Sequence, residues 1–188
     1  MANEANGPTA LAAGIQARCA AIEVLAVDVD GVLTDGRIIV DDRGVETKNF
    51  HVRDGMAFAL WHKAGKASAI ISGRSTPAVE RRAAELGIGL VVQGVADKGE
   101  ALRALLAETG ATADQVCYVG DDLNDLPALR LVGLACCPAD AVPEVRAVVH
   151  LRARATGGTG VIREVVESVL KAKGLWHEAC GHYLAPTT

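Results

Sequence analysis

Apolar residues along the chain gather into short runs that alternate with longer amphipathic stretches. The runs have the length and composition of strands buried on both faces, which read as continuous Val, Ile and Leu. Strands are expected at 22–27, 67–71, 89–92, 115–119, 133–136 and 147–151, and helices at 9–21, 55–64, 75–87, 97–109, 124–131, 140–146 and 161–173. Strands that alternate with helices of this length predict right-handed strand-helix-strand units and a parallel sheet.

One segment interrupts this alternation directly after the first strand. Residues 37–40 and 45–50 have extended patterns and flank an Asp-Asp-Arg-Gly turn, which is typical of a β-hairpin. This insertion, at about 36–51, is too small to form a lid, so no cap domain is expected. Asp54 is expected to cap the helix that follows. The predicted fold is a Rossmann-like three-layer α/β/α domain with a parallel sheet and a β-hairpin insertion.

Composition predicts one globular domain without a nucleic-acid partner. The chain has 188 residues, of which 50% are hydrophobic and only 3% aromatic, so small aliphatic side chains build its core. We expect an N-terminal extension at 1–21, disordered over 1–8, a main domain at 22–174 and a frayed tail at 175–188. A formal net charge of −4 without a basic run argues against nucleic-acid binding.

The cysteines and the hydropathy pattern bear on the compartment. Five cysteines, an odd number without metal-binding spacing, are expected to be core thiols in a reducing environment. The sequence shows no apolar stretch of about twenty residues and no basic signal segment. These patterns predict a cytoplasmic protein with no membrane partner.

Polar groups suited to phosphate chemistry follow three of the predicted strands. Asp28 and Asp30 end the first, Ser72 ends the second, and Asp121 with Asp122 ends the fourth. Ligands of open α/β sheets bind beyond the carboxyl ends of the strands, so these groups are expected to converge on one crevice. Because side chains alternate along an extended backbone, Asp28 and Asp30 are expected to face one ligand.

Lys98, at the start of the helix after the third strand, completes the set. Clustered carboxylates repel one another unless a cation lies among them, and oxygen ligands of this kind suit Mg²⁺. One carboxylate can attack phosphorus to give an aspartyl-phosphate, while the second can protonate the leaving alkoxide and later deprotonate water. Ser72 can hydrogen-bond a phosphoryl oxygen, and Lys98 can offset negative charge. These residues therefore indicate a Mg²⁺-dependent phosphatase.

The same residues resemble the four motifs of the haloacid dehalogenase superfamily, in the same order. The segment Asp28-Val-Asp30-Gly-Val resembles the first motif and Ser72-Gly-Arg the second. Lys98 resembles the third motif, and the Gly-Asp-Asp-Leu-Asn-Asp segment that begins at Gly120 resembles the fourth.

This resemblance implies a role for each acid. Asp28 is the implied nucleophile, and Asp30 is the implied general acid and base. The implied Mg²⁺ ligands are Asp28, the backbone carbonyl of Asp30, and Asp121. Asp122 and Asp125 are implied to support the metal-bound water or the motif lysine.

A narrower resemblance covers about residues 20–175. The hairpin, the segment from Phe50 to Gly55 and the glycine-rich segment at 157–164 resemble the 3-deoxy-D-manno-octulosonate 8-phosphate phosphatases, a family without a cap domain. The resemblance implies a homotetramer in which the hairpins associate and a neighbour's glycine segment helps cover the site. It also implies that a sugar acid phosphate is bound by His51, Val52, Arg53, Asp54, Gly55, Arg74, Arg82 and Lys98.

Arg74 bears on which sugar acid is expected. A guanidinium group matches a carboxylate in bidentate fashion, as an acidic sugar requires. A sister group that acts on nine-carbon keto-sugar acid phosphates tends to carry glutamate at this position, so Arg74 favours the eight-carbon substrate and the nine-carbon one is the alternative. Arg82 could instead lie on a solvated helix face, and His51 could simply pack beside Phe50.

Three other functions are compatible with strand-end acids. A phosphomutase of this superfamily generally carries a helical cap, for which the hairpin leaves no room. A signalling module like a receiver domain places its phosphorylated aspartate after the third strand, whereas here the acids follow the first and fourth. A non-catalytic oligomerisation domain would not need the complete set of Asp28, Asp30, Lys98 and Asp121.

Overall fold

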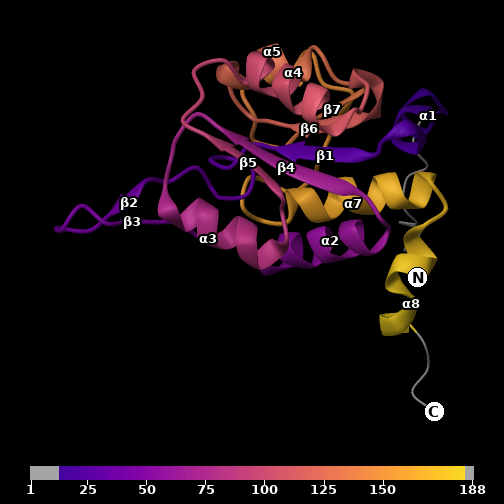
Figure 1. Cartoon of the computed structure of the whole chain (residues 1–188), viewed down its shortest axis with the longest axis horizontal. Helices are drawn as coiled ribbons and strands as arrows, with labels where there is room; N and C mark the ends of the chain where they lie inside the picture. Colours follow the sequence, from indigo (N-terminus) through magenta and orange to yellow (C-terminus); the bar gives the residue numbers. More distant parts are fainter. Residues whose placement is uncertain (1–12, 185–188) are drawn as a thin grey trace, which may run out of the picture.

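The computed structural model describes residues 13–184, and a six-stranded sheet forms its middle layer (Figure 1). Its strands are β1 (Val24–Val27), β4 (Ala67–Ser72), β5 (Leu90–Gln93), β6 (Val116–Val119), β7 (Leu134–Cys137) and β8 (Leu151–Arg152). Their order is β5-β4-β1-β6-β7-β8, and every neighbouring pair is parallel. The chain winds outward from β1 to one side and then from β6 to the other, so the strand order reverses between β1 and β6. Ligands bind at such a reversal in open α/β sheets.

Helices cover both faces of the sheet, as the sequence predicts. One face carries α2 (Val52–Lys63), α3 (Pro77–Leu86) and α7 (Val161–Ala172), and the other carries α4 (Lys98–Thr109), α5 (Leu126–Leu129) and α6 (Pro143–Arg146). A hydrophobic core lies on each face of the sheet, and strand β1 contributes to both. Leu25 and Val27 pack in the first core, beneath α2, α3 and α7, and Val24 and Ala26 pack in the second. The three-layer α/β/α prediction is confirmed.

Helix caps fix the positions of Lys98, at the start of α4, and of Asp125, in the 3-10 turn after β6. Asp97 caps α4 by accepting the backbone N–H groups of Gly99 at 2.8 Å and Glu100 at 3.1 Å, so Lys98 is the first residue of that helix. The 3-10 turn at Leu123–Asp125 is capped in the same way by Asp122, which accepts the N–H of Leu123 at 2.7 Å.

The predicted hairpin is present and stands away from the body of the domain (Figure 1). It consists of two short antiparallel strands, β2 (Ile39–Val40) and β3 (Glu46–Thr47). Its apolar side chains are solvent-exposed in the single chain, with 59% exposure for Ile38 and 54% for both Val40 and Val45. An exposed apolar patch of this kind usually marks a protein contact.

Three local predictions were wrong. Helix α2 begins at Val52 with His51 as its N-cap, whereas Asp54 lies buried in the first turn. The helix expected at 124–131 is a 3-10 turn followed by the short α5, because Asp122 caps the turn and the N–H of Asp125 bonds to the carbonyl of Asp122 at 2.9 Å. The strand expected at 147–151 is reduced to β8, since the N–H groups of residues 147–149 bond back to carbonyls of α6.

The C-terminal region is a packed helix, α8 (Trp176–Leu184), where a frayed tail was expected. Ala179 and Cys180 of α8 are buried against the first core, and the guanidinium of Arg163 lies 5.1 Å from the ring centroid of Trp176. The helix α1 (Ala13–Ala21) confirms part of the helix expected at 9–21, and the expectation for residues 1–8 lies outside the described residues.

All five cysteines are buried, as predicted for core thiols. Among residues 13–184, no helix has the length and apolar character needed to cross a membrane.

Candidate active site

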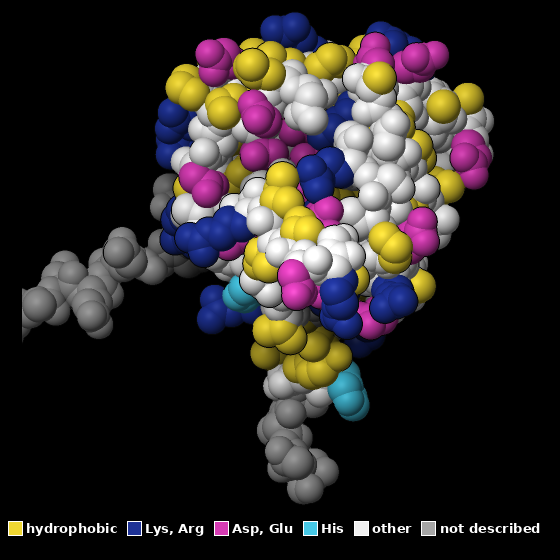
Figure 2. Space-filling model, turned by 90° about the vertical axis from the view of Figure 1, so that its left-hand side faces the viewer, with side chains coloured by type: hydrophobic (Ala, Val, Ile, Leu, Met, Phe, Trp, Pro, Cys, Tyr) yellow, Lys and Arg dark blue, Asp and Glu magenta, His cyan; other side chains and the backbone are white. Residues whose placement is uncertain are grey.

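The carboxyl ends of three adjacent strands bring the predicted acids and their partners together. Strand β1 lies between β4 and β6, so Asp28 after β1, Ser72 at the end of β4 and Asp121 after β6 share one edge of the sheet. Figure 2 looks onto this edge, where acidic and basic side chains lie side by side around a hollow. The expected convergence on one crevice is therefore observed.

A buried lysine links two of these acids. The Nζ atom of Lys98 lies 2.8 Å from Asp28 Oδ1 and 2.7 Å from Asp125 Oδ1, and the Lys98 side chain is 1% exposed. A charge with so little access to water is tolerated only when it is paired and hydrogen-bonded. Lys98 therefore belongs to the site rather than to the surface.

Asp125 fixes the loop that follows β6. Besides Lys98, its carboxylate accepts the hydroxyl of Tyr118 at 2.8 Å and the backbone N–H groups of Asp121 at 2.9 Å and Asp122 at 3.2 Å. With four donors, Asp125 is saturated. The Asp122 carboxylate instead caps its own turn.

Asp121 and Asp28 carry negative charge that their protein neighbours do not fully compensate. Burial, followed by the nearby charges of Asp125 and Asp28, raises the pKa of Asp121 to about 8. Burial and Asp125 likewise raise the pKa of Asp28, although Lys98 opposes the shift. The Oδ1 atom of Asp121 is buried without a hydrogen-bond partner among residues 13–184. Both carboxyl groups would therefore ionise more readily if a cation lay between them.

The donor set fits a hard divalent cation. One carboxylate oxygen from each of Asp28, Asp121 and Asp125 lies within 4.8 Å of the others. Carboxylate oxygens are the ligands that Mg²⁺ prefers. Because Asp125 is saturated by its four donors, two carboxylates of this group are left to bind a cation: Asp28, whose Oδ1 also contacts Lys98, and Asp121, whose Oδ1 has no partner among residues 13–184.

The carboxylate of Asp30 turns to the hairpin rather than to this cluster. Its Oδ1 pairs with Lys48 at 2.5 Å, and its Oδ2 lies 3.6 Å from Nε of Arg74. Glu46 joins the same two cations, with Oε1 at 2.9 Å from Lys48 and Oε2 at 2.6 Å from Arg74. In this structure the carboxylates of Asp28 and Asp30 contact different partners, and the expectation that they face one ligand stays a prediction.

Sequence reasoning missed Lys48, Glu46 and Tyr118. The spacing of Glu46 and Lys48 was an available signal, because residues two apart on an extended arm point to one side. The sequence does not show that the hairpin is oriented so that Glu46 and Lys48 reach Asp30 and Arg74. Tyr118 lies inside a buried strand, and a hydroxyl there needs a partner, which Asp125 provides.

The residues expected to bind substrate fall into separate groups. Arg74 lies beside Asp30, and the Oγ of Ser72 accepts the backbone N–H of Arg74 at 3.3 Å. Arg82 instead packs against Phe50, 5.9 Å from the ring centroid, and against Gly55, where an added Cβ would lie 2.7 Å from its guanidinium.

The start of α2 lies beside the glycine segment. The Nδ1 atom of His51 accepts the backbone N–H of Arg53 at 3.2 Å, and both side chains border Gly160. Val52 is 79% exposed and contributes nothing to the core. Asp54 points into the protein, where its Oδ1 accepts the backbone N–H of Arg163 at 2.9 Å.

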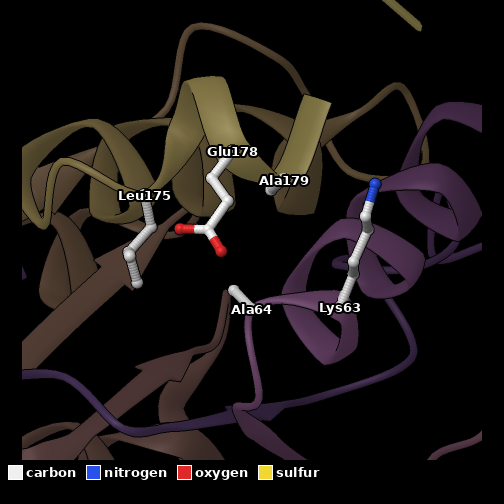
Figure 3. Close-up of a pocket in the computed structure, with 5 residues that line it drawn as sticks. All are labelled: Lys63, Ala64, Leu175, Glu178 and Ala179. Atoms are coloured by element: carbon white, nitrogen blue, oxygen red, sulfur yellow. The ribbon is translucent and has the colours of Figure 1, made fainter. Parts of the chain in front are cut away.

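The glycine segment packs against the first motif of its own chain. The N–H of Gly158 donates to the carbonyl of Val32 at 3.0 Å, and a Cβ added at Gly157 would lie 2.2 Å from the carbonyl oxygen of Gly31. The segment therefore supports the loop that carries Asp30. A pocket elsewhere, between the end of α2 and α8, shares no residue with the acidic cluster (Figure 3); it is lined by Lys63, Ala64, Leu175, Glu178 and Ala179.

Comparison with known proteins agrees with this geometry. The sequence of residues 44–133 matches the family model of the haloacid dehalogenase-like hydrolases. The 3-deoxy-D-manno-octulosonate 8-phosphate phosphatase KdsC of Haemophilus influenzae is 40% identical over 153 residues, which cover 81% of this chain and 85% of that protein.

Two solved structures share the fold over most of their length. A probable YrbI family phosphatase from Pseudomonas syringae is 44% identical with a TM-score of 0.91, and the match covers 94% of this chain and all of that one. The 3-deoxy-D-manno-octulosonate 8-phosphate phosphatase of Moraxella catarrhalis, solved with magnesium, phosphate and KDO, is 40% identical with a TM-score of 0.88. That match covers 90% of this chain and 97% of the other.

The chain therefore belongs to the haloacid dehalogenase-like hydrolase family. Within that family it groups with the 3-deoxy-D-manno-octulosonate 8-phosphate phosphatases, and its activity is that of a phosphomonoesterase.

Proposed function

We propose that the enzyme hydrolyses 3-deoxy-D-manno-octulosonate 8-phosphate to the free sugar acid and phosphate through an aspartyl-phosphate intermediate. The observation that carries this proposal is the buried pairing of Asp28 with Lys98 at 2.8 Å, close to an oxygen of Asp121 that has no partner within the described part of the chain. The relatives at about 40% identity that act on this sugar acid phosphate support the choice of substrate.

In the proposed first half-reaction, a carboxylate oxygen of Asp28 attacks phosphorus while the bond from phosphorus to the sugar oxygen breaks. Asp30 gives its proton to the leaving sugar oxygen. In the second half, Asp30 takes a proton from water, whose oxygen attacks phosphorus and releases phosphate from Asp28. Lys98 offsets the negative charge that gathers beside Asp28, and Ser72 donates a hydrogen bond to the phosphoryl group.

Asp28 and Asp121 are the proposed side-chain ligands of Mg²⁺, together with the backbone carbonyl of Asp30. When bound, Mg²⁺ neutralises the repulsion between the carboxylates and the phosphate and polarises the phosphoryl group. Asp122 and Asp125 are proposed to hold the loop in place, since Asp125 accepts the N–H of Asp121 at 2.9 Å.

Arg74 is the proposed partner of the substrate carboxylate. In this structure it pairs with Glu46 at 2.6 Å and lies near Asp30, so it is already at the mouth of the site. Arg82, His51, Val52, Arg53 and Gly55 are proposed to shape the remaining surface around the sugar. For Asp54 an indirect role is favoured, because the residue is 3% exposed and its carboxylate accepts an N–H group of α7.

The enzyme is further proposed to act in the cytoplasm as a homotetramer whose hairpins associate. Exposed Ile38, Val40 and Val45 on the hairpin support this assembly. A contribution of a neighbour's glycine segment to the site stays a prediction.

The test is phosphate release by purified enzyme with Mg²⁺ from a panel of substrates. The eight-carbon keto-acid phosphate is expected to give the highest kcat/KM, above a nine-carbon keto-acid phosphate and simple hexose phosphates. Asp28→Asn is expected to abolish turnover. A clear preference for hexose phosphates would refute the sugar acid, and full activity of Asp28→Asn would refute the mechanism.

A further inference from the structure

Lys48 is a buried cation that the proposed chemistry does not use. It follows strand β3 of the hairpin, yet its side chain is 1% exposed because it turns back to the mouth of the site. There its Nζ lies between Asp30 and Glu46, at 2.5 Å and 2.9 Å. A lysine is almost never buried to this degree unless its charge is paired.

Lys48 belongs to a group of four charges that balance one another. Asp30 and Glu46 are each shared by the same two cations, Lys48 and Arg74, so acid and base alternate around the group. Removing one partner of a buried pair is strongly destabilising, whereas exposed pairs contribute little. The Arg74 side chain is 43% exposed, so Lys48 is the member that fixes the carboxylate of Asp30.

We propose that Lys48 is the positioning residue for Asp30, and that Glu46 in turn holds Lys48 at the site. The inference rests on the proposed role of Asp30 as general acid and base. Through this contact the hairpin sets the direction of the Asp30 carboxylate, while Lys98, which is itself paired with Asp125, contacts the carboxylate of Asp28. The hairpin is thus part of the catalytic apparatus of its own chain.

This role has a signature that depends on the leaving group. Transfer of the phosphoryl group from an alkyl phosphate to Asp28 requires that Asp30 protonates the leaving oxygen, because an alkoxide is a poor leaving group. Transfer from p-nitrophenyl phosphate does not, because nitrophenolate leaves without protonation. The value of kcat/KM reports this first transfer, whereas kcat also includes the later attack of water.

The experiment compares kcat/KM for a sugar phosphate and for p-nitrophenyl phosphate in Lys48→Met, Lys48→Arg and the wild type. Lys48→Met is expected to lose at least about tenfold on the sugar phosphate, within the roughly 10²–10⁴-fold that general acid catalysis contributes, and less than about threefold on p-nitrophenyl phosphate. Lys48→Arg, which keeps the charge, is expected to recover part of the loss.

Lys66→Met is the matched control, because Lys66 also pairs with a glutamate, Glu23 at 2.5 Å, but at the amino end of β4. It is expected to leave the ratio of the two kcat/KM values unchanged. Thermal unfolding checks that each variant is folded. If Lys48→Met does not fold, Glu46→Gln serves in its place, with a smaller loss in the same direction.

An equal loss on both substrates would overturn the proposal, since it would place Lys48 in phosphate binding or in stability alone. Asp30→Asn separates this outcome from failure of the proposed function. If Asp30→Asn shows no dependence on the leaving group, the role of Asp30 is wrong. If it does, and Lys48→Met lowers kcat/KM further in that background, the two residues act independently and the positioning role is wrong.

Discussion

The carboxylate of Asp54 caps a helix that begins 107 positions further along the chain: its Oδ1 accepts the backbone N–H of Arg163, near the start of α7, at 2.9 Å. The residue before the helix, Gly160, has no side chain to make this bond. An acid near a helix N-terminus satisfies N–H groups that otherwise have no partner and interacts favourably with the helix dipole. Asp54 therefore joins α2 to α7, the helix that directly follows the glycine segment.

Asp54→Ala is expected to lower the free energy of unfolding by about 1–2 kcal/mol, the usual cost of removing a cap. The midpoint of urea denaturation measures this loss. Glu108→Ala, which removes an exposed acid from α4, is the control and is expected to change stability by less than about 0.5 kcal/mol. If both variants behave alike, Asp54 has no capping role.

The same carboxylate predicts a dependence of stability on pH. Burial raises the pKa of Asp54, and the N–H groups of Arg163 and Ile162 oppose this only in part. An acid whose pKa is higher in the folded state binds more protons there than in the unfolded state, so stability falls as pH rises through the interval between the two values. Wild type is expected to lose stability relative to Asp54→Asn, which cannot ionise, between about pH 4 and the folded pKa of Asp54. A constant difference between the two proteins over that interval would contradict the prediction.

Gly31 is expected to be essential for metal binding. Its φ of +87° disfavours any other residue, and an added Cβ would lie 2.0 Å from Oδ2 of Asp121. Gly31→Ala should cost at least about 1–2 kcal/mol for the backbone conformation and should displace Asp121.

Thermal unfolding with and without Mg²⁺ measures the effect of Gly31→Ala on the metal. A ligand that binds only the folded state raises the midpoint, so wild type is expected to gain stability with Mg²⁺ and the variant to gain much less. Gly14→Ala in α1, where an added Cβ meets no atom within 4 Å, should respond to Mg²⁺ as wild type does. If Mg²⁺ stabilises Gly31→Ala as much as it stabilises wild type, Asp121 is not a ligand of the metal.

A charge on the hairpin is expected to disrupt the proposed tetramer. Ile39 is 41% exposed in the single chain, and burying a lysine there against another hairpin would cost several kcal/mol. Analytical ultracentrifugation should show Ile39→Lys as a smaller species than wild type. Tyr183→Lys, at an exposed position of α8, is the control, and an unchanged mass for Ile39→Lys would exclude the hairpin as the interface.

Much of this site could be predicted from sequence because it is built from strand ends. Asp28, Ser72 and Asp121 each follow an apolar run, and parallel pairing brings the ends of β1, β4 and β6 to one edge whatever the loops do. Lys98 could be assigned to the site only by its place in the order of the family motifs, at the start of the helix after the third predicted strand. The three strand-end positions depend on local signals and on a single topological rule.

What could not be predicted depends on contacts between distant segments. Asp54 looks like a cap for its own helix, and only the packing of α2 on α7 shows that it caps another. From sequence alone Lys48 would be taken for a surface residue, because its contact with Asp30 depends on the orientation of the hairpin. Helix α8 could not be predicted because it has few apolar residues, and these are buried only through its packing against α2 and α7.

The contact between Gly157 and Gly31 is made by main chain alone, with no space for even a methyl group between the two segments. Side chains can change rotamer and absorb a displacement, but two backbones in contact cannot. A side chain added at Gly157 would therefore have to displace either its own segment or the backbone of Gly31, next to Asp30. Position 157, which carries no functional group, therefore accepts glycine alone unless one of the two segments moves.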